Sequence, residues 1–148
     1  MVPMRSLILV CAAAFAIAGC AQPAAPNKAE ALTAAAALKN GKSIFLTGKD
    51  SAGFRILAQQ APLRASCAAC HRANGSGGVH LPGGAISADL RQKALVTDQN
   101  PPYTLTTLER AISTGVDNLD KPLDPVMPRW KMTPRDLHDV AMYVLTLK

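Results

Sequence analysis

The sequence predicts a single all-α domain of three to four helices. Apolar residues recur at helical spacing near both ends of the chain, over 30–47 and over 133–147. A third helix is expected to begin at Thr106, and 148 residues suit one domain. A short β-hairpin insertion is also expected, because glycine and polar residues at 48–53 precede the short apolar run 54–57.

The N-terminus has the features of an export signal. A short basic start (1–5) precedes an uncharged, mostly apolar run (6–18), which is shorter than the roughly 20 residues needed to span a bilayer. The tetrapeptide at 17–20, Ile-Ala-Gly-Cys, resembles a bacterial lipobox, in which the signal is cut before the cysteine and the cysteine is lipidated. Ordinary cleavage after Ala18 and an uncut membrane anchor are the alternatives. We favour a lipoprotein with its lipid on Cys20.

Lipidation there divides the chain into a signal peptide at 1–19, a flexible tether at 20–30 and a folded domain at 31–148. Residues 21–27 contain two prolines, no charge and no apolar period, as an extended tether would. Ala21 is not the aspartate associated with inner-membrane retention, which slightly favours the outer membrane. We therefore expect the domain on the periplasmic side of a bacterial membrane, anchored by lipid.

The first predicted helix runs from Glu30 to about Thr47. Four residues are expected to share one face: Ala34, Leu38, Gly41 and Phe45. A glycine inside a helix costs roughly 1 kcal/mol relative to alanine. We interpret Gly41 as a point of close approach by another helix.

The pentapeptide Cys67-Ala68-Ala69-Cys70-His71 carries the chemistry of the chain. Its spacing is the attachment signature of c-type haem, in which each thiol forms a thioether with one vinyl group of the porphyrin. The imidazole of His71 then lies under the iron as the proximal ligand. A zinc site needs about four ligands, and a thioredoxin-like dithiol expects a βαβ context; neither pattern is found in the sequence. The motif predicts one covalent haem c.

A glycine-rich segment at 74–84 follows the haem motif and is expected to lie against the haem edge. Pro82 is the favoured source of a backbone carbonyl that accepts a hydrogen bond from Nδ1 of His71, which would fix the imidazole tautomer. Three neighbours could supply the carbonyl instead: Leu81, Gly83 and Gly84. His80, in the same segment, is expected to be a solvated histidine rather than an iron ligand.

Two further helices are predicted in the second half of the chain. One opens at Thr106, which has capping-box spacing to Glu109, and stops at Gly115. The other opens at Thr133, followed by a proline at the first helical position. Its buried stripe is expected to comprise Leu137, Val140, Ala141, Val144 and Leu147. A proline-punctuated loop at 116–131 separates the two helices.

The second axial ligand of the iron is sought among five methionines. Two of them leave with the signal peptide, and Met142 lies within the last helix. Met132 has hydrophobic-staple spacing to Leu137, which gives it a structural role. Met127 lies on the loop before a proline, so we favour it over Met132 and over an open or histidine-ligated site. Histidine–methionine ligation suits electron transfer, whereas an open site suits ligand binding or catalysis.

The haem motif, the run Met127-Pro128-Arg129-Trp130 and the last helix together resemble a class I cytochrome c domain over roughly 38–148. The resemblance implies the class I cytochrome c fold, in which helices surround a covalent haem, and it implies Met127 as the distal ligand of the iron. It also implies that Gly41 and Phe45 cross Tyr143 of the last helix. Trp130 is expected either beside the haem or its propionates or in a plain core position.

The sequence departs from this family in two places. Arg72 follows the ligand histidine where many relatives have glycine. The span from Phe45 to Cys67 is longer than in compact members, so the expected hairpin is an insertion of unassigned role.

The expected function is one-electron transfer between redox proteins, by an electron carrier that is not itself a catalyst. The chain could act alone or as the haem subunit of a larger dehydrogenase or reductase complex. The alternatives are a haem enzyme or gas sensor with an open sixth site, and a structural lipoprotein without cofactor. The net charge of +6 suits redox partners with an acidic docking surface. Nucleic-acid binding is not expected, because the basic residues are scattered and few aromatic residues accompany them.

Overall fold

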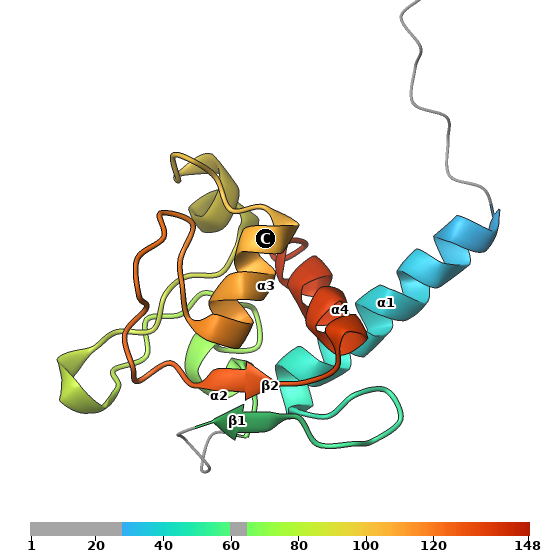
Figure 1. Cartoon of the computed structure of the whole chain (residues 1–148), viewed down its shortest axis with the longest axis horizontal. Helices are drawn as coiled ribbons and strands as arrows, with labels where there is room; N and C mark the ends of the chain where they lie inside the picture. Colours follow the sequence, from blue (N-terminus) through green and yellow to red (C-terminus); the bar gives the residue numbers. More distant parts are fainter. Residues whose placement is uncertain (1–27, 60–64) are drawn as a thin grey trace, which may run out of the picture.

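A computed structural model describes residues 28–59 and 65–148 (Figure 1). The predicted signal peptide, Cys20 and the tether up to residue 27 lie outside the described residues. The elements follow in the order α1 (Lys28–Thr47), β1 (Leu57–Gln59), α2 (Ala68–His71), η1 (Pro82–Gly84), η2 (Lys93–Thr97), α3 (Leu105–Thr114), β2 (Arg129–Lys131) and α4 (Pro134–Val144). None of the helices in the described part of the chain is long and apolar enough to cross a membrane.

Helices α1 and α4 cross at close range, as Gly41 predicts. A Cβ atom at Gly41 would lie 2.0 Å from the backbone oxygen of Asp139 and 2.9 Å from Cβ of Tyr143. Phe45, fully buried, packs its ring against Tyr143 with the centroids 5.5 Å apart. The predicted close approach is therefore confirmed, and only glycine fits the crossing point.

A buried polar network fixes the same two helices relative to each other. The side-chain amide of Asn40 donates hydrogen bonds to Asp136 Oδ1 and Asp139 Oδ2, both at 2.9 Å. Its carbonyl oxygen accepts from the backbone N–H of Ser51 at 2.7 Å. One residue of α1 thus holds two carboxylates of α4 and the turn that follows α1.

The start of α1 differs from the prediction, while the start of α4 confirms it. α1 begins at Lys28 and takes in the last three residues of the predicted tether; of its predicted face, Ala34 is exposed. Thr133 caps α4, its hydroxyl oxygen accepting from the N–H of Asp136 at 3.1 Å, and Pro134 occupies the first helical position.

Helix α3 ends where predicted, but its N-cap lies two residues earlier than expected. Gly115 terminates it in the left-handed conformation, with φ 71° and ψ 39°. The N-cap is Thr104, not Thr106. The reason is that Thr104 and Thr107 each bond the other's backbone N–H through their side chains, a reciprocal arrangement that Thr106 and Glu109 do not form.

The expected hairpin insertion proves to be a small turn followed by a longer-range pairing. Lys49 and Arg55 form an isolated antiparallel bridge, closed by the bond from Asp50 N–H to the carbonyl of Phe54 at 2.9 Å. β1 then pairs antiparallel with β2, placing Ala58 opposite Trp130 and Gln59 opposite Arg129. The all-α expectation therefore needs correction: the fold is mostly helical with a two-stranded sheet. Strands of three residues are too short to show an alternating pattern in the sequence.

We predict that Gly41→Ala destabilises the protein by about 2 kcal/mol or more, because its methyl group would overlap the backbone of Asp139 and force α1 away from α4. Chemical denaturation followed by circular dichroism measures this change. Lys42→Ala, at an exposed position of the same helix, is the matched control and should change stability by less than about 0.5 kcal/mol. Equal effects of the two substitutions would contradict the close-contact interpretation.

Candidate functional site

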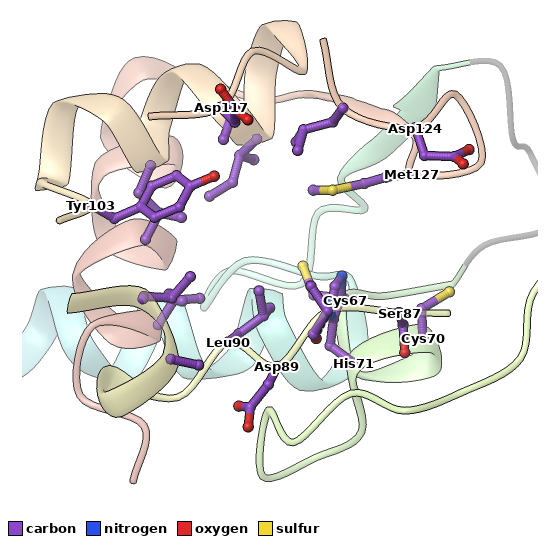
Figure 2. A pocket seen from close by; sticks show the side chains of 18 of the residues that line it. Cys67, Cys70, His71, Ser87, Asp89, Leu90, Tyr103, Asp117, Asp124 and Met127 are labelled. Carbon is purple, nitrogen blue, oxygen red and sulfur yellow. Dashed lines mark hydrogen bonds between the residues drawn. The ribbon is translucent and has the colours of Figure 1, made fainter. Parts of the chain in front are cut away.

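A cavity of about 510 Å³ opens between α2, α3 and the loop that precedes β2 (Figure 2). Its volume lies within the range of roughly 300–1,000 Å³ that is usual for ligand and cofactor sites. Most of its lining is apolar, and Phe45 of α1 and Val140 and Val144 of α4 form its floor. The helix crossing described above therefore shapes this cavity directly.

The haem motif forms one wall of the cavity. α2 is a single turn in which the N–H of His71 bonds the carbonyl of Cys67 at 2.9 Å. The turn brings Cys67, Cys70 and His71 to the same cavity, as Figure 2 shows. Two thiols and an imidazole thus line one apolar site, which is the donor set that a covalently attached haem requires.

The state of the thiols does not fit the two alternatives for this motif. Burial raises the pKa of the Cys67 thiol to about 12, and the neighbouring Cys70 adds to the rise. A redox-active dithiol instead needs a lowered thiol pKa. Within residues 28–59 and 65–148, no group of three histidine, cysteine or acidic side chains is placed to hold a metal such as zinc.

His71 is oriented by a backbone carbonyl, but not by that of Pro82. Its Nδ1 lies 2.8 Å from the carbonyl oxygen of Ala88, and because a carbonyl only accepts, Nδ1 carries the proton. Burial lowers the pKa of His71, with the Ala88 bond opposing that shift. The imidazole is therefore neutral and leaves Nε2 free to bind a metal.

The shape of the glycine-rich segment explains why the Pro82 prediction is wrong. The segment folds back on itself: Gly78 N–H bonds the carbonyl of Ser87 at 2.8 Å, and Ser87 N–H bonds that of Val79 at 2.9 Å. Pro82 is carried to the exposed tip of this hairpin, and Ala88 returns beside His71. Every residue has a backbone carbonyl, so the residue type gives no indication of which carbonyl accepts the bond. The sequence therefore could not identify Ala88 as the acceptor.

Met127 lies on the opposite wall of the cavity. Figure 2 shows its thioether across the cavity from His71, on the loop that leads into β2. Met132 does not line the cavity and packs against the core, and His80 is exposed and does not line it either. The geometry places one methionine, of the two weighed as ligands, opposite the imidazole.

Trp130 lies in the core, one of the two places expected for it, and it also lines the cavity; its packing beside the haem stays a prediction. It is 5% exposed, belongs to the hydrophobic core and also lines the cavity. Its pairing with Ala58 of β1 holds it there, so the two-stranded sheet, which sequence reasoning missed, positions a cavity residue.

Tyr103 and the acidic side chains of the lining were also missed. The Tyr103 hydroxyl points toward the cavity, and burial raises its pKa (Figure 2). The acidic lining residues are Asp89, Asp117 and Asp124, whereas no lysine or arginine of the described residues lines the cavity. Tyr103 follows two prolines in an irregular stretch, and no sequence pattern connects it to the haem motif.

Arg72, directly after His71, has a strained backbone. Its φ of 64° and ψ of 162° fall in a region that essentially only glycine adopts without cost. The conformation is one that favours glycine, the residue that the resemblance led us to expect at this position. The chain turns sharply here, and Arg72 accepts a bond from the N–H of Gly75 at 3.1 Å.

In a comparison with protein families, the family model described as Cytochrome c matches residues 38–148. The matched region includes every residue that lines the cavity. Comparison with curated proteins and with solved structures finds no match to this chain.

We predict that Arg72→Gly stabilises the protein by about 1 kcal/mol, because glycine removes the strain at this φ and ψ. Thermal unfolding monitored by circular dichroism measures the gain. Arg72→Ala removes the same charge but keeps a Cβ atom, so it should give no comparable gain. If the two variants have the same stability, backbone strain is not the cause.

Proposed function

Because this chain belongs to the cytochrome c family, in which haem c is bound covalently with its iron, we propose that it is a mono-haem electron carrier with His71 and Met127 as axial ligands. The observation that carries the proposal is the arrangement across one apolar cavity: a neutral imidazole with a free Nε2 on one wall and a thioether on the other. When bound, the haem iron supplies a ferric–ferrous couple that exchanges one electron.

The cavity residues would hold the cofactor in place while its charge changes. Cys67 and Cys70 would anchor it as thioethers, and the bond from Nδ1 of His71 to Ala88 would keep the imidazole plane fixed. A site of this kind needs no ligand exchange during electron transfer, so little of the protein has to rearrange. For this reason we place the chain among electron carriers rather than catalysts, either alone or as a subunit of an oxidoreductase complex.

The proposed partners are redox proteins with an acidic docking surface. The full chain has a net charge of +6, and removal of the proposed signal peptide with Arg5 would leave about +5. This positive charge would steer an acidic protein toward the chain, and the attraction would weaken with salt. The cavity lining itself carries aspartates and none of the described lysines or arginines, so the basic residues that would attract such a partner lie outside the lining.

We further propose that the protein is a lipoprotein held on the periplasmic side of a bacterial membrane. Of the two membranes, the outer membrane is slightly favoured over the inner one. The lipobox-like 17–20 and the proline-containing 21–27 support this proposal. Its domain boundaries would be a signal peptide at 1–19, a tether at 20–30 and the haem domain at 31–148, with the start of α1 overlapping the tether.

Met127→Ala should abolish the weak far-red absorption band of the ferric protein, which reports methionine ligation in this family. Met132→Ala is the control and should keep the band, because Met132 packs against the core and does not line the cavity. Haem staining of a denatured gel should show covalent haem in the wild type and in both variants. A wild type without the band would exclude Met127 as ligand and favour an enzyme or sensor with an open sixth site.

Cys20→Ser should abolish lipidation and move the protein from the membrane fraction to the soluble periplasmic fraction of a bacterial host. Fractionation and labelling with a radioactive fatty acid measure both effects. Cys11→Ser is the matched control, because Cys11 lies inside the predicted signal peptide and should not affect labelling. Continued labelling of the Cys20→Ser protein would contradict the lipoprotein assignment.

A further inference from the structure

Arg129, next but one to Met127, bonds the backbone of the loop that carries this methionine. Its guanidinium donates one hydrogen bond to the carbonyl of Met127 at 2.5 Å and another to the carbonyl of Leu123 at 3.1 Å. Leu123 and Met127 both line the cavity. One side chain therefore joins two points of the loop that are four residues apart.

The guanidinium is seated against the end of α3. A Cβ atom at Gly115 would lie 1.8 Å from Nε and 1.9 Å from Cζ of Arg129, so the side chain occupies the space that glycine leaves open. The loop is attached at the same point, because Leu123 N–H bonds the carbonyl of Gly115 at 2.8 Å. Gly115 thus both ends α3 and makes room for the contact.

Arg129 acts from a rigid element. It lies on β2 opposite Gln59 of β1, and the next residue, Trp130, is buried in the core. The planar fork of an arginine can bond two carbonyls at once, whereas a lysine ammonium is a point donor on a flexible stem. The pairing of β1 with β2 therefore holds the backbone of Arg129 in place, and the hydrogen bonds of its guanidinium hold the loop relative to the sheet.

We propose that Arg129 is a positioning residue that keeps the 123–127 loop closed and so holds the Met127 thioether in the cavity. This inference rests on the proposed role of Met127 as the distal ligand. Without the two bonds, the Leu123 end of the loop stays attached to Gly115, but the Met127 end keeps only short-range contacts, such as Met127 N–H to the carbonyl of Asp124 at 3.0 Å. Local opening of the loop, rather than unfolding of the domain, is the expected consequence.

Imidazole binding to the ferric holoprotein tests this. Exogenous imidazole can replace Met127 only when the loop is open, so its apparent affinity reports the open fraction. Arg129→Gln should raise that affinity about tenfold and weaken the far-red band at 25 °C. Arg129→Lys, which keeps the charge but cannot bridge both carbonyls, should fall between Arg129→Gln and the wild type.

Lys131→Gln is the matched control, since Lys131 is exposed on the same strand and its loss removes the same charge. It should leave both readouts unchanged. Gly115→Ala approaches the same contact from the other side, because its methyl group would displace the guanidinium. It should also raise imidazole affinity, and the double variant with Arg129→Gln should show less than the sum of the two single effects. The strain of alanine at the left-handed φ of 71° remains in both backgrounds and is read separately from the unfolding midpoint.

Two outcomes would overturn the proposal, and they are distinguishable. If Arg129→Gln lowers the global unfolding midpoint but keeps the wild-type band and imidazole affinity, Arg129 has only a structural role. If the wild type lacks the band, Met127 is not the ligand and the proposed function fails together with this inference. Should Arg129→Gln not fold, Arg129→Lys and Gly115→Ala decide the question by the same measurements.

Discussion

The close contact between the backbones of α1 and α4 is the constraint on which the rest of the structure depends. Gly41 allows the carbonyl of Asp139 to lie against the backbone of α1, and Phe45, Val140 and Val144 of the two helices then line the same cavity. Asn40 makes this arrangement specific, because its amide satisfies Asp136 and Asp139 only when the two helices are in register. A different crossing would remove the Asn40 bonds to both buried carboxylates, leaving Asp136 with the hydroxyl of Thr133 and Asp139 with the more distant guanidinium of Arg135, and would also distort the site.

Helix ends could be predicted where a single residue type accounts for them. Thr133 with Pro134 at the start of α4 and Gly115 at the end of α3 are such cases. The start of α3 was different, because threonines stand at 104, 106 and 107 and spacing alone allows more than one cap. The reciprocal pair of Thr104 and Thr107 satisfies two backbone donors, and that tertiary detail decides between them.

The candidate site also has parts that could be predicted from the sequence and parts that could not. Cys67, Cys70, His71 and Met127 could be predicted because the chemistry of their side chains and their spacing carry the signal. The groups that orient them could not, since the carbonyl of Ala88 and the pairing of β1 with β2 belong to the main chain. A three-residue strand is too short to show an alternating pattern, and its partner strand is more than sixty residues away along the chain. No local sequence pattern therefore predicts this pairing.

Helix α1 is longer than its contact with the domain requires. Among the α1 residues whose burial is described, 33–47, the first buried one is Asn40, and Ala34 is exposed. Figure 1 shows the start of the helix projecting beyond the rest of the fold. At 1.5 Å per residue, Lys28 lies about 18 Å along the axis from Asn40. The first turns of α1 therefore extend away from the domain in the direction that the crossing with α4 gives the helix. The chain before Lys28 is therefore joined to the outer end of this helix, and the distance between that junction and the domain is set by the length of α1 and not by an extended linker alone.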